Sequence, residues 1–470
     1  MLEKEELTGK IINACMEVHN ELGNELQNSK KGITLVIPNP CGNIKETKMK
    51  NSGIEWIGEI PDDWEVSKIG QLYEERKTKV SDTVYPPLSV TMQGILPQLE
   101  TAAKSDAHDD RKLVLKGDFA INSRSDRRGS CGISEFDGSV SLINTVLHPK
   151  TEMNPIYYNW LFHSFRFSDE YYKNGHGIVD DLWTTSWTEM KKIFIPLPPK
   201  ETQQRIASYL DKKCNKIEET IQNQQQVIEK LKAYKQSLIT EAVTGKVKIE
   251  NGKACGEYES YKDSGVEWIG KIPSEWEVKK LKFSSQIMRG LFSHRPRNDP
   301  DYYDGVHPFI QTGEVARAVK YITTYSQTLN ELGFSVSREF PAGTVLLTIA
   351  ANVGDVAILD FNACFPDSVI GFYPKENVSK IFMFYVLKSM KEQFMRNAII
   401  STQMNLNINI VKEEFIPLPS LAEQKEIVKF LEKKSDYIDT AIEQKQNLIE
   451  KLTEYKKSLI YECVTGKKEV

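Results

Sequence analysis

The sequence predicts an α+β protein in which two pseudo-symmetric globular domains are joined by two long helices that form an antiparallel coiled coil. Two internal repeats carry this prediction. The segment Phe194–Lys246 recurs without a gap as Phe415–Lys467. The motif SGIEWIGEIPDDWEV at Ser52–Val66 recurs as SGVEWIGKIPSEWEV at Ser264–Val278, and we call it the opening motif. Because an internal repeat reflects a repeated structural unit, the chain consists of two similar halves.

The longer repeat has the pattern of a coiled-coil helix. Each copy begins at a Pro-x-Pro, which cannot continue a helix, and closes with Thr-Gly, so that Gly245 and Gly466 stand at C-terminal cap positions. Between these ends, apolar residues recur at alternating spacings of three and four, which is a heptad pattern. The stripe comprises Leu210, Ile217, Ile221, Ile228, Leu231 and Leu238 in the first copy and Leu431, Ile438, Ile442, Ile449, Leu452 and Leu459 in the second. Polar residues interrupt it at Gln224, Lys235, Lys445 and Lys456.

The length of these helices decides what they pack against. A helix of about 42 residues is about 63 Å long, which exceeds the width of a small domain. Its stripe therefore needs an equally long partner, and the other copy is the obvious one. If the linker between them stays local the pair is antiparallel, and if the linker stretches back the pair is parallel. A further alternative is that each helix packs only on its own domain.

The repeats divide the chain into six segments. These are an N-terminal extension without an assigned function (1–50), a first globular domain (51–195), the first long helix (196–246), a linker (247–263), a second globular domain (264–416), and the second long helix with the C-terminus (417–470). The four tryptophans of the opening motifs, Trp56, Trp64, Trp268 and Trp276, occupy identical positions in both halves. We expect them to be packing anchors rather than base-stacking groups.

The two globular domains differ in sequence but share a skeleton of two strands joined by a loop and followed by a helix. The expected strands are Lys116–Asn122 and Cys131–Phe136 in the first domain, and Ala342–Ile349 and Val356–Phe361 in the second. The expected helices are Tyr157–Phe165 and Phe382–Met390. A shared frame with divergent loops is how a binding domain changes its ligand while keeping its core.

Composition places the chain among ordinary globular proteins. Its 470 residues allow two to four domains, 27% of them are charged, and the formal net charge is −4. The charged N-terminus and the lack of a long apolar run predict a cytoplasmic protein without a signal peptide or membrane span. Seven scattered cysteines without a Cys-x-x-Cys pair predict neither a metal site nor a disulfide framework. Any nucleic-acid-binding surface must be locally basic or completed by partner subunits.

Catalytic motifs are missing from the sequence. There is no phosphate-binding G-x-x-x-x-G-K-[ST] loop, and no Gly-rich loop that could bind S-adenosylmethionine. Asn154-Pro155-Ile156-Tyr157 differs by one residue from the Asn-Pro-Pro-aromatic motif of amino-methyltransferases. Without the second proline or a cofactor loop, we interpret it as the start of a helix. We therefore expect a non-catalytic chain that holds no metal and no cofactor.

Two groups of polar residues in each domain have the chemistry for reading DNA. Arginine forks match guanine edges and phosphates, whereas Asn and Gln amides match adenine edges. The candidates are Arg124, Arg127, Arg128, Lys173 and His176 in the first domain and Arg289, His294, Arg295, Arg297, Gln403, Asn405 and Asn407 in the second. A single cluster of this kind is more often a solvated face than a DNA-binding surface. Its recurrence in both domains makes the two interpretations about equal before any resemblance is considered.

The doubled pattern of opening motif, variable domain and F-I-P-L-P followed by a long helix resembles the DNA-specificity subunit of a type I restriction-modification system. The resemblance covers residues 51–470. It implies that the two globular domains are target-recognition domains, each reading one half of a bipartite, asymmetric site in double-stranded DNA. It also implies that the helices set the spacer and dock two methyltransferase subunits, to which restriction subunits add. S-adenosylmethionine and ATP with Mg²⁺ would then bind to those partners, and this chain would be the non-catalytic reader.

Two alternatives from other classes remain open. The chain could be a stand-alone adenine DNA methyltransferase, which the missing cofactor loop argues against. It could also be a coiled-coil scaffold without DNA specificity, which would bind every duplex with the same affinity.

Overall fold

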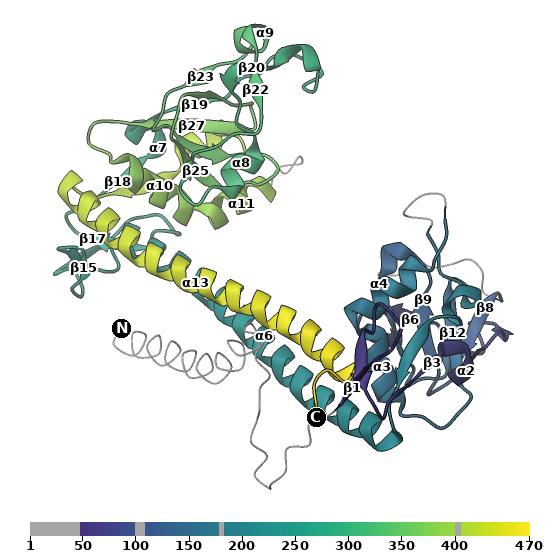
Figure 1. Cartoon of the computed structure of the whole chain (residues 1–470). Helices are drawn as coiled ribbons and strands as arrows, with labels where there is room; N and C mark the ends of the chain where they lie inside the picture. Colours follow the sequence, from purple (N-terminus) through teal and green to yellow (C-terminus); the bar gives the residue numbers. More distant parts are fainter. Residues whose placement is uncertain (1–47, 99–108, 178–182, 400–405) are drawn as a thin grey trace. The chain divides into compact units, whose positions relative to one another are not determined.

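The computed structural model describes residues 48–98, 109–177, 183–399 and 406–470 (Figure 1). The described residues form two compact units, one made of those up to Asn223 together with Asn447–Val470, and the other of Gln224–Gln446. The long helices α6 (Lys200–Val243) and α13 (Leu421–Val464) each contribute to both units. The prediction of an α+β chain with two long helices is therefore confirmed. No helix in these ranges is long and apolar enough to span a membrane.

A four-stranded antiparallel sheet forms the centre of the first unit. Its order is β10 (Cys131–Ile133), β9 (Phe119–Asn122), β12 (Asn144–Pro149) and β4 (Tyr73–Glu75). Successive side chains of a strand point to opposite faces. Phe119 and Ile121 accordingly pack with helices α3 (Pro155–His163) and α4 (Phe165–Lys173). Ala120 instead packs with the strands β6 (Leu88–Thr91), β7 (Gly94–Pro97), β8 (Arg111–Val114) and β11 (Gly138–Val140). The remaining short elements of this domain are α2 (Ile69–Leu72), β5 (Lys79–Val80), the 3₁₀ turn η1 (Ser125–Arg127) and α5 (Trp187–Met190).

The second unit is built around a five-stranded sheet. Its order is β19 (Ser285–Arg289), β27 (Val369–Pro374), β24 (Val345–Thr348), β25 (Val356–Leu359) and β21 (Tyr321–Ile322), with only the last pair parallel. Val345 and Leu347 pack with helix α10 (Lys380–Ser389), whereas Leu346 packs with helix α8 (Thr312–Arg317) on the other face. The other elements are α7 (Leu281–Ser284), η3 (Pro300–Tyr302), β20 (Tyr303–Pro308), β22 (Thr328–Leu329), α9 (Glu331–Ser335), β23 (Glu339–Phe340), β26 (Ala363–Cys364), α11 (Lys391–Ile399) and α12 (Ile408–Glu413).

The two sheets correspond strand for strand. The order β10-β9-β12-β4 in the first unit matches β25-β24-β27-β19 in the second. Both predicted strand pairs are present, as β9–β10 and β24–β25, and the predicted helices are α3 and α10. The predicted common skeleton is therefore confirmed.

The opening motif and the Phe-Ile-Pro-Leu segment pair in each unit. Strand β3 (Glu65–Lys68) is antiparallel to β13 (Phe194–Leu197), and β18 (Glu277–Lys280) is antiparallel to β28 (Phe415–Leu418). Trp56 Nε1 donates to the Phe194 carbonyl oxygen at 3.2 Å, and Trp276 Nε1 donates to Glu423 Oε1 at 3.1 Å. Three of the four tryptophans are buried and the fourth, Trp268, is half-buried against the core. They are packing anchors, as predicted.

A buried glutamine on each long helix connects that helix to its globular domain. Gln203 Nε2 donates to the Pro198 carbonyl, and its Oε1 accepts from the backbone N–H of Asn154 just before α3. Gln424 makes the equivalent bonds to the Pro419 carbonyl and to the backbone N–H of Ser379 before α10. Because each side chain satisfies two backbone groups that would otherwise be buried without a partner, the helix start and the domain helix are held together.

The Thr-Gly-Lys that closes each long helix is a docking motif. Gly245 and Gly466 have φ of +70° and +72°, which L side chains rarely adopt. A Cβ at Gly466 would also collide with Pro61 of the first opening motif, and one at Gly245 would collide with Pro273 of the second. The lysines that follow cap backbone carbonyls of these motifs, for example Lys246 Nζ to the Ile269 carbonyl at 2.9 Å. The end of α13 thus packs on the first opening motif and the end of α6 packs on the second.

The predicted linker at 247–263 contains regular structure. Strands β14 (Ile249–Glu250) and β15 (Lys253–Ala254) form a hairpin, and Gly252 N–H in its turn donates to Glu426 Oε2 of α13 at 2.7 Å. Strand β16 (Tyr261–Asp263) pairs with β17 (Lys271–Pro273) inside the opening motif. The same pairing in the first unit joins β1 (Met49–Asn51) to β2 (Glu59–Pro61). Each opening motif therefore folds back on the residues that precede it.

The apolar stripe of the long helices is buried within both units. Of its twelve residues, Leu210, Ile217, Ile221, Ile228, Leu431, Ile438, Leu452 and Leu459 are buried, and Leu231, Leu238, Ile442 and Ile449 are half-buried. In the first unit, Leu210 and Ile217 of α6 share a cluster with Leu452 and Leu459 of α13 and with the domain helix α3. The helices therefore pack on each other and on their domains, so the alternative of separate packing is wrong.

Two ion pairs connect the helices. Lys235 Nζ lies 2.6 Å from Asp439 Oδ2 in the second unit, and Lys456 Nζ lies 2.6 Å from Glu218 Oε2 in the first. The residue that lies later in α6 therefore contacts the residue that lies earlier in α13, and the reverse holds for the second pair. Lys235 and Lys456 occupy equivalent positions of the two repeats, and so do Glu218 and Asp439. The two polar interruptions at Lys235 and Lys456 are therefore used as cross-helix contacts.

Candidate nucleic-acid interface

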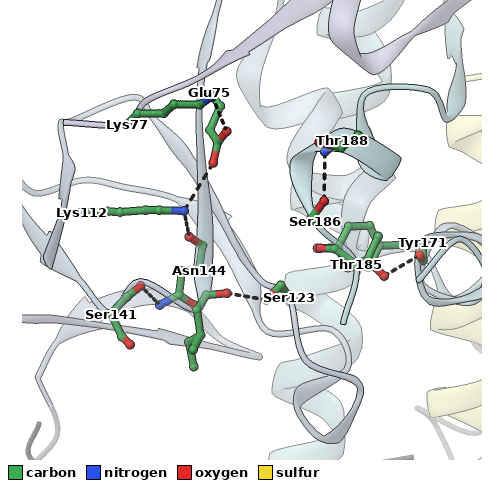
Figure 2. A network of polar contacts seen from close by, with 11 residues as sticks. Glu75, Lys77, Lys112, Ser123, Ser141, Asn144, Tyr171, Thr185, Ser186 and Thr188 are labelled. Atoms are coloured by element: carbon green, nitrogen blue, oxygen red, sulfur yellow. Dashed lines mark hydrogen bonds and ion pairs between the residues drawn. The ribbon is translucent and has the colours of Figure 1, made fainter. Parts of the chain in front are cut away.

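Three segments of the first unit meet where strand β9 ends (Figure 2). The Ser123 hydroxyl donates to the Ile143 carbonyl, in the loop before β12, at 2.5 Å. The Ser123 carbonyl accepts from the Thr185 N–H, in the segment before β13, at 3.0 Å. The loop after β9, the loop before β12 and the segment before β13 are therefore fixed to one another, and we call this contact the first junction.

Buried polar groups hold the first junction rigid. Lys112 Nζ donates to the Asn144 carbonyl at 2.8 Å and contacts Glu75 at 3.3 Å, while Asn144 Nδ2 donates to the Ser141 carbonyl at 3.0 Å (Figure 2). Tyr171 O–H donates to the Thr185 carbonyl at 3.0 Å. Burial raises the pKa of Tyr171 well above its ordinary value, so its hydroxyl stays a donor. These buried hydrogen bonds favour a single arrangement of the three segments, while Asn144 Oδ1 is buried without a partner among the described residues.

The candidate residues of the first domain lie on two segments that the first junction brings together. Arg124 and His176 both form isolated β-bridges with Thr184, and the Ser125 N–H donates to the Trp183 carbonyl at 3.0 Å. Arg124, Arg127, Arg128, Lys173 and His176 are all exposed. The structure therefore gathers Arg124 and His176, which lie far apart in the sequence, on one surface.

The other positively charged candidates of this domain, Arg127, Arg128 and Lys173, form weak, exposed ion pairs with acidic neighbours. Arg128 lies over the Tyr172 ring, with 5.0 Å between its guanidinium carbon and the ring centroid, and 3.5 Å from Asp169 Oδ1. Arg127 lies 3.6 Å from Asp126, and Lys173, at the end of α4, lies 3.4 Å from Glu55 of the opening motif. Exposed pairs of this kind contribute about 0–1 kcal/mol each, so a phosphate can replace the carboxylate.

The second unit contains the same junction. The Ile349 N–H donates to the Ser368 carbonyl before β27 at 2.9 Å, and the Ile349 carbonyl accepts from the Leu406 N–H before β28 at 2.8 Å. Two of the candidates, Gln403 and Asn405, lie outside the described residues. Asn407 is exposed, but its side-chain oxygen caps α12 by accepting from the Asn409 N–H at 2.8 Å. Each unit thus holds three segments together at the equivalent position of its own sheet. We call the contact in the second unit the second junction.

Three arginines of the second domain converge on Asp367, which stands next to Ser368 in the second junction. Arg289 Nε donates to the Asp367 carbonyl at 2.5 Å. Arg295 Nη2 lies 3.4 Å from Asp367 Oδ2, and Arg297 Nη2 contacts the other carboxylate oxygen. Sequence reasoning found these arginines but missed Asp367, because no sequence spacing connects it to residues about seventy positions earlier.

His294 has a structural role in this surface. Its ring stacks on Tyr302 with 3.8 Å between the ring centroids, and its Nε2 lies 2.9 Å from Asp299 Oδ2. The side chain is half-buried, and these contacts shape the turn that carries Arg295 and Arg297. Arg338, another residue missed in the sequence, donates from Nη1 to the Arg289 carbonyl at 3.3 Å and is exposed.

The segment that resembles a methyltransferase motif starts a helix, as predicted. Asn154 is the N-cap of α3, where its Oδ1 accepts from the Tyr157 N–H at 3.0 Å and its Nδ2 donates to Gln204 Oε1 at 2.6 Å. Both ends of the amide are therefore occupied within the fold. Across the described ranges, no group of three or more His, Cys, Asp or Glu side chains is arranged to hold a metal ion.

Comparison with known proteins identifies the family. The family model of the type I restriction modification DNA specificity domain matches residues 61–230 and 273–452. The chain belongs to this family. The two matched segments are the two halves of the repeat. The chain is therefore a DNA-specificity subunit of the type I restriction-modification class, as the resemblance implied.

Specificity subunits from an archaeon and a bacterium are similar over most of the chain. The putative type I restriction enzyme MjaX specificity subunit of Methanocaldococcus jannaschii is 26% identical over 407 residues, which are 82% of this chain and 89% of that protein. The EcoDI specificity subunit of Escherichia coli is 23% identical over 410 residues, which are 82% and 84% of the two chains.

A solved structure has the same fold. A chain from a study of complex assembly and conformational transition of the type I R-M system matches with a TM-score of 0.67 and 15% identity, covering 87% of this chain and 99% of that one.

Proposed function

We propose that each unit of this specificity subunit reads one half of a bipartite, asymmetric site in double-stranded DNA. The observation that carries the proposal is the matching pair of junctions, which hold different side chains on the same frame. The first junction presents Arg124 and His176, whereas the second presents Arg289 and Arg297 around Asp367. Side chains that differ on equivalent surfaces read different base sequences.

We further propose that α6 and α13 form an antiparallel coiled coil that sets the spacer between the half-sites. The two repeat-related ion pairs, Lys235–Asp439 and Lys456–Glu218, support one antiparallel register. The buried heptad stripe supports the coiled coil itself. Helix length then determines the distance between the two readers, and half-sites on one face of the duplex lie about one helical turn apart.

Catalysis is proposed to belong to partner subunits in the cytoplasm. Two methyltransferase subunits would dock on the helices and carry S-adenosylmethionine, and restriction subunits would carry ATP with Mg²⁺. The role of Asn154 as a helix cap supports a non-catalytic chain, because the segment that resembles a methyltransferase motif is used for folding. Partner subunits would also complete a positive DNA channel around a chain with a net charge of −4.

Methylome sequencing of cells with and without the gene tests this function. We expect a bipartite motif with one methylated adenine in each half to be present only when the gene is. Methyl transfer by the purified chain alone would instead support a stand-alone methyltransferase. If the partner complex binds all duplexes with equal affinity, the chain is a scaffold without specificity.

A further inference from the structure

We propose that Arg289 and Arg297 are the DNA-contacting arginines of the second unit, and that Asp367 and Arg295 are positioning residues that aim them. This inference rests on the proposed function and adds the division of labour within the cluster. The ligand chemistry is a pair of hydrogen-bond acceptors on DNA, supplied either by the O6 and N7 atoms of guanine or by two oxygens of a phosphate.

The hydrogen bonds of the three guanidinium groups separate their roles. Arg295 uses Nη1 to donate to the Phe292 and His294 carbonyls, each at 2.7 Å, and Nη2 to contact Asp367. Both terminal nitrogens of the Arg295 guanidinium therefore already have acceptors within the protein. Among the described residues, Arg289 donates only from Nε, to the Asp367 carbonyl, and Arg297 donates only from Nη2, to the Asp367 carboxylate. A guanidinium has five N–H donors in a fixed plane, so holding one side of the fork orients the donors that remain.

Charge balance favours an anionic or electron-rich ligand at this cluster. Within the described part of the chain, Arg295 and Arg297 form ion pairs with Asp367 and with no other carboxylate. Arg289 and Arg338 add two positive charges beside it. The Asp367 carboxylate is therefore shared by two guanidinium groups, and the repulsion between them is relieved when DNA acceptors approach.

The backbone beside Arg289 lies very close to the loop that precedes β27. Strand β19 ends at Arg289 and is followed by Gly290, whose N–H donates to the Val369 carbonyl at 2.9 Å. A Cβ at Gly290 would collide with the carbonyl oxygens of Phe365 and Pro366. Glycine at this position lets the end of β19 lie directly against the loop that carries Asp367, which precedes β27; strands β19 and β27 are neighbours in Figure 1.

The test uses the complete methyltransferase complex assembled with subunit variants and duplexes that carry the bipartite site. We expect Arg289→Ala and Arg297→Ala to weaken binding about tenfold or more each. A loss confined to duplexes with an intact second half-site identifies guanine as the ligand. A loss on every duplex together with a smaller salt dependence identifies phosphate. Arg317→Ala, an exposed arginine on α8 that pairs with Glu314, is the matched control and should bind like the wild type.

Asp367→Asn tests the positioning of Arg297, because it removes the carboxylate that pairs with Arg297 and keeps the backbone carbonyl that holds Arg289. We expect it to reduce affinity for the second half-site while leaving recognition of the first half-site unchanged. Combining it with Arg289→Ala and Arg297→Ala should cost no more than those two changes alone, because the groups that it aims are gone. A merely structural role would instead add a further loss and would lower the thermal stability of all variants alike.

Two outcomes would overturn the proposal. One is unchanged affinity and methylation for both alanine variants and for the milder Arg289→Lys and Arg297→Lys, which keep the charge but lose the fork. The other is a strong effect of Arg295→Lys with none at Arg289 or Arg297. Binding of the wild-type complex to different duplexes is the control for the proposed function. A wild-type complex that does not discriminate between duplexes contradicts that function, whereas either outcome above with a discriminating wild type contradicts only the roles of these residues.

Discussion

At the scale of single residues, the structure separates side chains that serve the fold from those that are open to a ligand. His294, Arg295 and Asn407 have the chemistry to read DNA, but they hold turns and helix ends in place. Arg124, Arg127 and Arg128 make few and exposed contacts. The sequence shows which residues have the chemistry to bind DNA. Which of them are open to a ligand depends on neighbours that are distant in the chain.

The loop of the first junction is expected to contact DNA phosphates. The double variant Arg127→Ala with Arg128→Ala should weaken binding to the first half-site and lower the slope of log affinity against log salt by about 2, because each phosphate contact contributes about 0.9. Filter binding or fluorescence anisotropy at several salt concentrations measures this slope. Unchanged affinity and an unchanged methylation pattern would remove the loop from the interface. A loss at both half-sites would point to misfolding.

Lys388 on α10 makes the second unit sensitive to pH. Burial first, and then the positive charge of Lys235, lower the pKa of Lys388 to about 8. Lys391 also lowers it, whereas Asp439 and Asp355 raise it. Since the folded pKa lies below the unfolded one, the unfolded chain binds more protons between about pH 8 and pH 10.4, and stability rises with pH across this window.

The variant Lys388→Met tests this dependence. Below pH 8 the buried charge costs about 3 kcal/mol, so the variant should be more stable than the wild type at pH 7 by several degrees in Tm. The difference should shrink as pH rises through the window. Thermal denaturation followed by circular dichroism at a series of pH values measures both effects. Parallel curves for the two proteins would contradict the pKa assignment.

At the scale of elements, the repeats predicted the long helices, the paired strands and the helix after them. Periodicity was sufficient here because these elements are long or lie between clear turn residues. The hairpin at β14–β15 and the strands β1 and β16 were not predicted. They are two or three residues long, and their pairing depends on contacts with α13 and the opening motifs rather than on an alternating pattern.

The ion pair Lys235–Asp439 should contribute to helix pairing. Its lysine side chain is only 15% exposed, whereas both members of Lys216–Glu219, on the surface of α6, are more than half exposed. In double-mutant cycles with Lys→Met and acid-to-amide changes, we expect a coupling energy of about 1 kcal/mol for Lys235–Asp439 and of at most about 0.5 kcal/mol for the control pair. Chemical denaturation measures both, and equal couplings would remove the pair as a register contact.

At the scale of the whole molecule, the proposed coiled coil makes helix length a determinant of DNA spacing. Removing Gln224–Lys230 from α6 and Gln444–Glu450 from α13 takes one heptad from each helix and leaves the ion pairs Lys235–Asp439 and Lys456–Glu218 in register. The helices shorten by about 10 Å. We therefore expect the spacer of the methylated motif to shorten by about three base pairs while both half-site sequences stay the same.

The single deletions are the controls for this experiment. Removing a heptad from one helix alone shifts the ion pairs out of register, so recognition should be lost. Methylome sequencing reports the spacer in each case. An unaltered spacer in the double deletion would show that something other than the helices determines the distance.

The sequence by itself determined the doubled architecture, the long helices and the family. Repeats and heptads can be recognised along the chain without knowing which residues meet in space. It also determined that the tryptophans are anchors, since identical positions in both halves imply a shared packing role. Only the tertiary structure decided which candidate residues meet. Ser123 with Thr185, and Ile349 with Leu406, are joined by backbone hydrogen bonds between segments more than fifty residues apart. Asp367 joins its arginines through the pairing of β19 with β27, a contact that residue spacing does not encode.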